Sequence, residues 1–430
     1  MSNVTHNKHP FASAYVETKI GVLPSSWQVI SLEELSDPSA PIRYGVVQIG
    51  PDTPDGIPIV PIKHINRIGS VALHRASPEI EAAYAGSRVK GGDVLISVKG
   101  TIGAVGVVPK GFEGNIAREI ARIRPTSACD ANFLALQLEA DNTQRRIDSK
   151  VVGSTRLEFS IHAVRDFLVA LPPLPEQRAI AALLMTWNTA IQKTEQLIAA
   201  KERYYSHELS RLISLGQHPH THIGAFAEEV SARNRGGSPA FLGDFLTESR
   251  EPDTEQDSAK RLTVRLHLQG VEPRPVRGTE SDGATAYFRR RAGQLIYGKQ
   301  NIFRGAIGIV PPELDGFAST QDLPAFDIAD GIDPQWLYFW LSRKDFYASL
   351  EVLAAGSGSK RLHPEEFFKI RVFVPDLAMQ TAIARYLNAL REEINLLGRS
   401  VAALKTQKRG LMQKLLTGQW RLPIIEGTYE

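Results

Sequence analysis

The chain lacks most of the features that mark secreted, membrane-embedded or redox-active proteins. Its 430 residues include a single cysteine, Cys129, which can form neither an internal disulfide nor a thiolate metal site. We therefore expect a buried, inert thiol. No segment approaches the roughly 20 consecutive apolar residues that cross a bilayer, and residues 1–10 are polar, without the apolar core of a signal peptide. The sequence predicts a cytoplasmic protein that has no redox chemistry and no membrane contact.

The chain also lacks a large excess of charge of either sign. The net charge is +3, and basic residues number 18 against 17 acidic ones in residues 1–170, and 19 against 21 in residues 220–372. Proteins that bind nucleic acid indiscriminately do so through an excess of cationic groups. Any contact of this chain with DNA must therefore come from local clusters.

Catalytic signatures are the third absence. The sequence has no Asn-Pro-Pro-aromatic string of the kind that adenine methyltransferases use on a flipped base, and no GxSxG or HExxH string. Gly293–Gln300 approximates a phosphate-binding loop, but Gln300 stands where a Ser or Thr would bind magnesium. His218, His220 and His222 have no carboxylate or cysteine to complete a metal site, which favours a polar linker. We predict no catalytic, cofactor-binding or metal-binding residues.

What the chain does have is an internal repeat with an offset near 200 residues. Three pairs of segments recur in the same order: 92–109 and 293–311, 153–159 and 358–368, and 171–184 and 374–387. In the first pair, Gly103-Ala104 aligns with Gly305-Ala306. Collinear matches across half the chain indicate a tandem duplication.

Each copy begins as a globule and ends as a helix. Short β-branched runs punctuated by Gly and Pro, such as Ile57–Ile62, Val94–Val98, Leu262–Leu266 and Ala306–Val310, predict mixed α/β or mostly β globules. The helical parts carry apolar residues at alternating steps of four and three, which is a heptad seam that needs a partner. The seam residues are Ile180, Leu184, Trp187, Ile191 and Ile198 in the first copy and Ile383, Leu387, Leu390, Ile394, Leu397, Val401 and Leu404 in the second.

Two helices of similar length most simply pair with each other as an antiparallel coiled coil. About 35 residues at about 1.5 Å each give a rod of roughly 50 Å, which would hold the two globules apart. The alternative is that each helix only covers its own globule with a broad apolar face. The predicted fold class is α+β, a tandem duplication of two mixed α/β domains, each followed by a long helix. The predicted divisions are a globule at 1–170, a helical region at 171–217, a second globule at 218–373, a second helical region at 374–420, and a tail at 421–430.

This alternation resembles the specificity subunit of type I restriction-modification systems, over nearly the whole chain. The string TKIGVLPSSWQVISLEEL (Thr18–Leu35) is similar to that family's opening, in which a Gly, a Pro and a Trp precede the first recognition domain. The string at 171–184 resembles the start of the family's helical region. It carries Pro172, Pro175, Glu176, Gln177 and Ile180 at the expected places. The second helix departs from this pattern, reading Asp-Leu-Ala-Met at 376–379, but keeps Gln380 and Ile383.

The resemblance implies a function and a set of partners. The two globules would be target recognition domains, each reading one half of a split site on double-stranded DNA, and the helices would dock two modification (methyltransferase) subunits. S-adenosylmethionine, the adenine-methylating residues, and the ATP- and magnesium-dependent cleavage machinery of the restriction subunits would all lie on those partners. This chain would be a non-catalytic subunit.

Sequence reading requires Arg, Lys, Asn, Gln, Ser and Thr on loops that reach base edges and phosphates. Both copies supply such residues near the repeated blocks, and the Gly-Ser-x-Arg-Leu strings place an arginine in each copy, Arg156 and Arg361. The candidates for DNA binding are Lys99, Thr101, Arg118, Arg146, Ser154, Thr155 and Arg156 in the first globule and Arg290, Lys299, Gln300, Asn301, Arg304, Ser359, Lys360 and Arg361 in the second.

Two other functions remain open at this point. One is an enzyme with its own methyltransferase or nuclease centre, against which the missing motifs argue. The other is a coiled-coil scaffold that joins proteins without reading DNA, which the heptad seams alone permit. The bases recognised depend on loop geometry that neither composition nor spacing determines.

Overall fold

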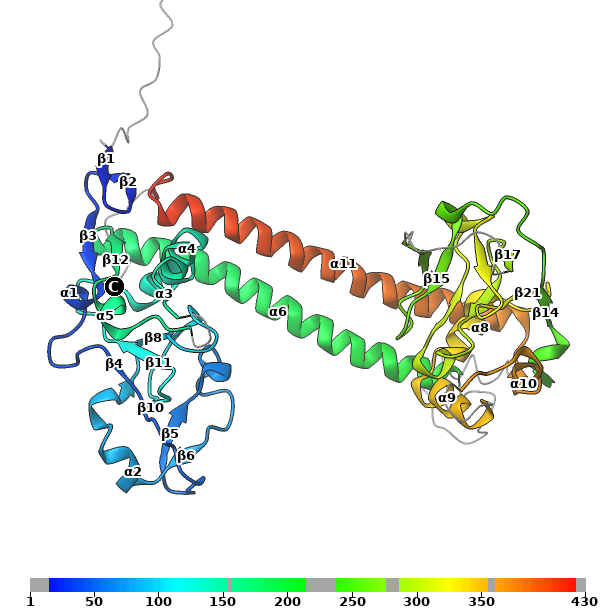
Figure 1. Cartoon of the computed structure of the whole chain (residues 1–430), viewed down its shortest axis with the longest axis horizontal. Coiled ribbons are helices and arrows are strands. Elements are labelled where there is room, and N and C mark those ends of the chain that lie inside the picture. The colour runs from blue at the N-terminus through cyan, green and yellow to red at the C-terminus, as the bar shows by residue number, and fades with distance from the viewer. Residues whose placement is uncertain (1–14, 154–156, 214–236, 276–285, 355–359, 423–430) are drawn as a thin grey trace, which may run out of the picture. The chain divides into compact units, whose positions relative to one another are not determined.

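The computed structural model describes residues 15–153, 157–213, 237–275, 286–354 and 360–422. The chain divides into two compact units, one of Met1–Glu195 with Arg399–Glu430 and the other of Gln196–Gly398. Two helices of 40 residues, α6 (Leu174–Ile213) and α11 (Leu377–Leu416), each contribute to both units (Figure 1). Each unit thus contains a globule together with parts of both helices, whereas the division expected from sequence set helices and globules apart.

The globule of the first unit is built on two four-stranded sheets. One has the order β4-β11-β8-β9, and the other has the order β6-β5-β10-β7, with β10 parallel to β5. A separate pair, β12 with β3, leads into α6. The strands are β1 (Tyr15–Thr18), β2 (Gly21–Pro24), β3 (Gln28–Ser31), β4 (Arg43–Tyr44), β5 (Ile57–Val60), β6 (Arg75–Ala76), β7 (Val89–Lys90), β8 (Val94–Ser97), β9 (Val105–Val107), β10 (Glu113–Ile116), β11 (Ile120–Ile123) and β12 (Leu168–Leu171). The helices are α1 (Leu32–Leu35), α2 (Pro78–Ala82), α3 (Ala131–Glu139), α4 (Asp141–Asp148) and α5 (Ile161–Arg165).

The globule of the second unit repeats this plan in part. Its described strands form one four-stranded sheet and three separate pairs, β13 with β22, β15 with β16 and β17 with β20. Its central sheet has the order β14-β21-β18-β19, and the pair β13 with β22 leads into α11. Its strands are β13 (Ser238–Phe241), β14 (Leu246–Ser249), β15 (Leu262–Val264), β16 (Val271–Pro273), β17 (Tyr287–Arg289), β18 (Leu295–Tyr297), β19 (Ile307–Ile309), β20 (Ala318–Thr320), β21 (Ala325–Ile328) and β22 (Arg371–Val374). Its helices are α8 (Pro334–Leu341), α9 (Lys344–Ser349) and α10 (Pro364–Phe368).

The backbone carries the duplication seen in the sequence. Strand β8 pairs with β9 and β11, and β18 pairs with β19 and β21, all antiparallel. The repeated glycines Gly103 and Gly305 have φ of +84° and +75°. This is the left-handed region, which side chains with a Cβ disfavour, so both copies need glycine there. The predicted α+β tandem duplication is confirmed.

The long helices pair within the first unit. Ile180 and Leu184 of α6 lie in one hydrophobic cluster with Leu415 and Leu416 of α11. Further along α6, the carboxylate of Glu195 lies 2.7 Å from Nζ of Lys405. Later residues of one helix therefore meet earlier residues of the other, which is antiparallel packing.

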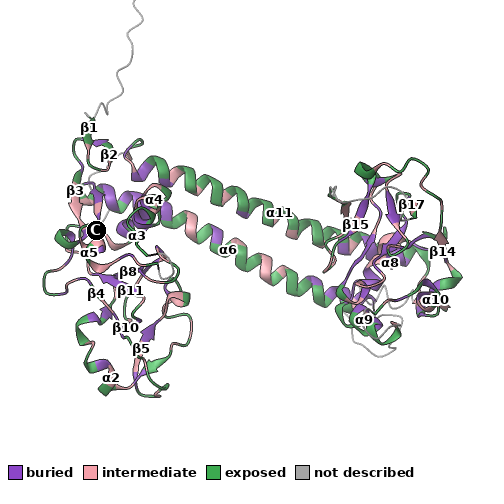
Figure 2. Ribbon diagram, in the orientation of Figure 1, coloured by how far each residue is buried: buried purple, intermediate pink, exposed green. Residues whose placement is uncertain are grey.

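The same relation holds within the second unit. Leu209 and Leu212 of α6 share a cluster with Ile383 and Leu387 of α11. Nζ of Lys201 lies 2.7 Å from Glu393, and the hydroxyls of Tyr204 and Tyr386 are 2.9 Å apart. All the predicted seam residues are buried or half-buried, while the outward helix faces are exposed (Figure 2). The predicted antiparallel pairing is confirmed, and the alternative, in which each helix only covers its own globule, is wrong.

A buried glutamine joins each globule to its helix. The side chain of Gln177 accepts a hydrogen bond from the backbone N–H of Asp130 (2.8 Å) and donates to the carbonyls of Ala128 (3.0 Å) and Pro172 (2.8 Å). Gln380 makes the equivalent three bonds in the second unit, to Asp333 (2.8 Å), Gly331 (3.3 Å) and Pro375 (2.8 Å). This shared role explains why the second helix keeps Gln380 although its neighbouring residues differ.

Replacing Gln177 by leucine should destabilise the first unit markedly. The substitution removes the partner of one backbone N–H and two carbonyls. The bond to Pro172 is buried, so leaving its carbonyl without a partner costs about 1–3 kcal/mol, and the two partly buried bonds, to Asp130 and Ala128, cost less. Chemical unfolding of the purified protein measures the change. Gln192→Leu, on an exposed position of the same helix, should stay within about 0.5 kcal/mol. Equal stability of the two variants would contradict the assigned role of Gln177.

The single cysteine lies in the core of the first unit. Cys129 is buried in the hydrophobic cluster that includes residues of β8 and β11. Burial raises the pKa of its thiol to about 12. The thiolate, which is the reactive form, is therefore scarce at neutral pH. The expectation of a buried thiol is confirmed.

Candidate nucleic-acid interface

Several of the predicted DNA-binding residues of the first unit lie at one end of the sheet β4-β11-β8-β9. Strands β8 and β11 are antiparallel, with Ser97 opposite Ile120. Residues that follow β8 and residues that precede β11 therefore lie at the same end of the sheet. Lys99 and Thr101 follow β8, and Arg118 precedes β11. We call this end the reading edge of the first unit.

Lys99 is held at the reading edge by two neighbours. Its Nζ lies 3.4 Å from a carboxylate oxygen of Glu158 and 4.5 Å from the centre of the Tyr44 ring. The Tyr44 hydroxyl donates a short hydrogen bond to the same carboxylate. This bond is the main cause of a lowered pKa of Glu158, and burial, ahead of the bond, raises the pKa of Tyr44 to about 12. Glu158 is therefore ionised and Tyr44 neutral at pH 7.

Thr101 and Arg118 face outward at the same edge. Both are exposed, and the side chain of Arg118 donates from Nε to Glu119 over 3.1 Å. The carbonyl of Thr101 accepts a bond of 2.5 Å from the Ser97 hydroxyl, so the backbone of the loop is anchored while the Thr101 side chain points to solvent. The arrangement suits contacts with the phosphates or the base edges of a nucleic acid.

The second unit has the corresponding edge. Lys299, Gln300, Asn301 and Arg304 lie on the connection from β18 to β19, which includes the short helix η7 (Ile302–Arg304). The backbone N–H of Lys299 donates to Asp322 (2.9 Å), and its carbonyl accepts from Leu362 (2.9 Å).

Two cations next to Leu362 complete this edge. Nε of Arg361 lies 3.6 Å from the Asp322 carboxylate, and Nζ of Lys360 lies 2.9 Å from Glu351. Six of the predicted residues of the second unit are thus brought to one side of its sheet: Lys299, Gln300, Asn301, Arg304, Lys360 and Arg361.

Two predicted residues make structural contacts within their own units. Arg290 is only 1% exposed, and its guanidinium donates to the Ser319 hydroxyl (2.7 Å) and the Ser249 carbonyl (2.8 Å). Burial lowers the pKa of Arg290 to about 10. Arg146 of α4 stacks 4.6 Å from the Phe167 ring centre and donates to a backbone carbonyl. The Arg290 guanidinium cannot reach DNA without unpacking its unit, so we correct that assignment. Arg146 is half-buried, and its assignment to DNA binding stays a prediction.

The arginine correspondence drawn from the Gly-Ser-x-Arg-Leu strings is also corrected. The backbone N–H of Phe159 donates to Val98 (2.9 Å), just as that of Leu362 donates to Lys299. Arg361, which precedes Leu362, therefore occupies the position of Glu158 and not that of Arg156. The candidates Ser154, Thr155, Arg156 and Ser359 lie outside the described residues, as do His218, His220 and His222.

Sequence reasoning missed the acidic and aromatic members of these edges. Tyr44, Glu158 and Asp322 each contact a predicted cation, yet they lie 55 or more residues from Lys99 or 39 residues from Arg361 in the sequence. A search for basic residues could not find them. Only the pairing of strands brings them together.

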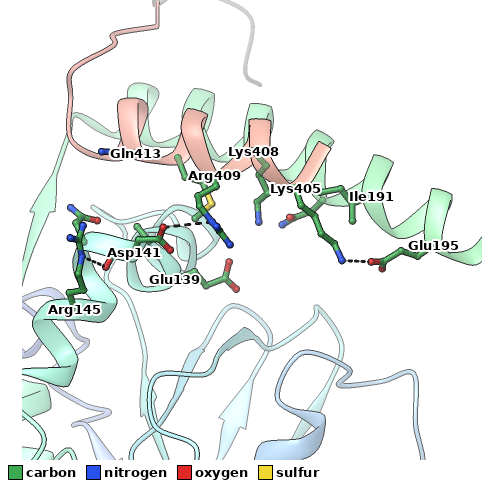
Figure 3. A pocket seen from close by; sticks show the side chains of 13 residues that line it. Glu139, Asp141, Arg145, Ile191, Glu195, Lys405, Lys408, Arg409 and Gln413 are labelled. Carbon is green, nitrogen blue, oxygen red and sulfur yellow. Dashed lines mark hydrogen bonds and ion pairs between the residues drawn. The ribbon is translucent and has the colours of Figure 1, made fainter. Parts of the chain in front are cut away.

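A hollow of about 470 Å³ lies between α4, α6 and α11 within the first unit (Figure 3). Its charged groups are largely engaged with one another. Lys405 pairs with Glu195 (2.7 Å), and Arg409 lies 3.7 Å from Asp141. No pair of a nucleophile and a general base lines it, and the described residues contain no group of three or more potential metal ligands.

No helix in the described part of the chain is long and apolar enough to span a membrane. Comparison with known proteins classifies the first globule. Residues 46–202 match the family model described as "Type I restriction modification DNA specificity domain". The match covers most of the first globule, including its reading edge, and continues into α6. The first globule is therefore similar to a DNA specificity domain over these residues, and the second unit repeats the antiparallel pairing of its sheet β4-β11-β8-β9 in part.

Individual relatives are similar to longer parts of the chain. It is 29% identical over 227 residues to the type I restriction enzyme EcoBI specificity subunit of Escherichia coli, which covers 51% of this chain and 45% of that protein. The chain thus matches less than half the length of that relative. A putative type I restriction enzyme MjaX specificity subunit from Methanocaldococcus jannaschii is 23% identical, with 95% of this chain and 97% of that one covered.

Solved structures show the same fold. The S subunit of a type I restriction-modification system from M. genitalium has a TM-score of 0.56 at 16% identity, covering 90% of this chain and 96% of that one. A chain from a structure on complex assembly and conformational transition of the type I system has a TM-score of 0.55 at 18% identity, covering 93% and 99%. The chain is thus similar in sequence and in fold to type I restriction-modification specificity subunits, the family that its sequence resembles.

Proposed function

We propose that this chain is the DNA-reading subunit of a type I restriction-modification complex, in which each globule reads one part of a split target. The observation that carries the proposal is the repeated reading edge. Both units place polar and cationic side chains at the same end of equivalent sheets, beside the same backbone hydrogen bonds.

The ion pairs of the reading edges favour selective over indiscriminate binding. Lys99, Arg118, Lys360 and Arg361 each lie within 4 Å of a carboxylate. DNA must displace or rearrange these carboxylates, which weakens attraction to phosphates in general. The cost is recovered only where base edges or the partner subunits supply further contacts. The isolated chain should therefore bind DNA weakly.

The helices are the proposed docking site for two modification subunits. Their seam faces are covered within each unit, but their outer faces are exposed (Figure 2), and the hollow beside Lys405 and Arg409 offers paired charges to a partner. In this proposal the modification subunits bind S-adenosylmethionine and methylate adenine. Restriction subunits would add ATP- and magnesium-dependent cleavage.

Removing the cations Lys99 and Arg118 of the first reading edge should weaken DNA binding. It should also make the affinity depend less steeply on salt concentration. If Lys99 and Arg118 contact phosphates, the double variant Lys99→Gln/Arg118→Gln should lower the slope of log affinity against log salt by up to about 0.9 for each lost contact. Fluorescence titration of the assembled complex with a target duplex measures it. Arg291→Gln removes an exposed cation paired with Glu251 and is the matched control. An unchanged slope in the double variant would show that this edge does not meet DNA.

The proposal as a whole is tested by methylome sequencing. Cells that express this chain with its modification subunit are compared with cells that express the modification subunit alone. Methylated adenine in a split motif should appear only when this chain is present. With assembly of the complex demonstrated, the absence of any such motif would favour a scaffold that does not read DNA.

A further inference from the structure

The two reading edges are built on the same backbone but carry opposite charge at one position. Three equivalent pairs of backbone bonds define the correspondence. Val98 donates to Glu119 (2.7 Å) as Lys299 donates to Asp322 (2.9 Å), and the bond from Phe159 to Val98 repeats in that from Leu362 to Lys299. Ser97 and Gly298 donate to the alanines that follow the repeated glycines, over 2.8 and 2.9 Å. The residues just before Phe159 and Leu362 are Glu158 and Arg361.

In the first unit this position holds a carboxylate that is fixed in place. The side chain of Glu158 is 35% exposed, so it is accessible to a ligand. Tyr44 and Lys99 both contact the carboxylate. An ionised carboxylate accepts about four hydrogen bonds, which leaves acceptor capacity toward solvent. A group that only accepts must be matched by a donor on its ligand.

In the second unit the same position holds a guanidinium. The side chain of Arg361 is 40% exposed and is oriented by Asp322 at 3.6 Å. A guanidinium only donates, and its planar fork matches two adjacent acceptors. The position of Lys99, whose ammonium neutralises Glu158, is taken in the second unit by Gln300, which carries no charge. The duplication has thus retained the geometry and inverted the hydrogen-bonding character.

Base edges in the major groove offer the complementary groups. The exocyclic amine of cytosine is a donor that carboxylates accept from, and O6 with N7 of guanine is the pair of acceptors that arginine binds with both arms of its fork. Such a contact discriminates against the wrong base by about 1–3 kcal/mol, or roughly five- to 150-fold.

We propose that Glu158 and Arg361 are equivalent specificity-determining residues with opposite preferences. Glu158 reads a cytosine in the part of the target bound by the first unit, and Arg361 reads a guanine in the part bound by the second. The inference rests on the proposed function, because it assigns bases within a target that the chain reads. It goes beyond that function by naming two residues and the base class of each.

The test is a comparison of methylated motifs. Cells expressing the modification subunit receive the wild-type chain, Glu158→Gln or Arg361→Gln, and assembly is verified by co-purification. Each variant should relax one base position in one half of the motif, with at least a fivefold loss of preference for cytosine or guanine, and leave the other half unchanged. Controls are Glu33→Gln, a carboxylate 60% exposed near Arg165, and Arg291→Gln, neither of which should alter the motif.

A second pair of variants separates base reading from a structural or phosphate contact. Arg361→Lys keeps the charge but loses the fork, so it should retain DNA binding and lose the guanine preference. Glu158→Asp shortens the side chain by one methylene group, which withdraws the carboxylate from the base, and should likewise weaken the cytosine preference. These two also serve where a glutamine variant does not assemble. Unchanged base preference in the assembled variants, or relaxation of both halves at once, overturns the inference. A wild-type chain that yields no chain-dependent motif overturns the proposed function instead.

Discussion

Replacing Arg421 by alanine should lower the free energy of unfolding of the first unit by about 3–5 kcal/mol, because it leaves a buried charge without its partner. Arg421 donates to the carboxylate of Glu176 from Nε (2.5 Å) and Nη2 (2.8 Å). Glu176 is fully buried and also accepts from the indole of Trp27 (3.2 Å). This carboxylate therefore joins the segment around Trp27, the start of α6 and the segment that follows α11.

Chemical unfolding, with labelling of the Cys129 thiol as the local probe, measures the loss. A buried thiol reacts only when its surroundings open, and Cys129 lies in the first unit. The matched control is Arg409→Ala, whose exposed pair with Asp141 spans 3.7 Å and should contribute at most about 1 kcal/mol.

The double variant Glu176→Gln/Arg421→Gln removes both charges together. It should be more stable than Arg421→Ala, since no uncompensated charge stays buried. If the single and double variants lose the same stability, the loss comes from packing and not from the buried charge.

Lengthening both helices by one heptad should lengthen the unspecified spacer in the methylated motif. Duplicating Ile191–Leu197 in α6 and Ile394–Ser400 in α11 adds seven residues to each helix and keeps the heptad phase of both seams. Seven residues add about 10 Å, which corresponds to no more than about three base pairs at about 3.4 Å each. We expect a motif with both specific halves unchanged and a spacer longer by about one to three base pairs.

The duplication in α6 alone is the control for this experiment. It shifts one seam against the other by two helical turns without lengthening its partner, so the pair can no longer keep all its contacts. The complex should assemble poorly and methylate little. A doubly lengthened chain that methylates the original motif with its original spacer would mean that the helices do not set the distance between the two half-sites.

The hydrophobic pattern was enough to predict the helices but not the contacts of their charged residues. A period of 3.5 residues depends only on which positions are apolar, so the spacing of Ile180, Leu184, Ile383 and Leu387 was sufficient to indicate a seam. The antiparallel arrangement followed from the similar length of the two helices. The role of Gln177 and Gln380 did not, because their partners are backbone groups of residues that sequence spacing does not bring near.

The candidate interface was predicted in part. The repeated glycines indicated the strand ends near which Lys99, Thr101, Lys299 and Gln300 lie, because a turn in the left-handed conformation favours glycine and both copies have such a turn. Arg290 was predicted to bind DNA but is buried, and a run of three arginines in the sequence does not indicate which guanidinium turns inward.

By itself, the sequence determined the duplication, the fold class, the long paired helices and the resemblance to a family, because each depends on a pattern that repeats along the chain. The tertiary structure alone decided which charged groups face one another. Glu158 reaches Lys99, Asp322 reaches Arg361, and Arg421 reaches Glu176 only after strands and helices far apart in sequence have packed. Charge pairing acts over a few ångströms in space and has no period in sequence, so it becomes visible only when the chain has folded.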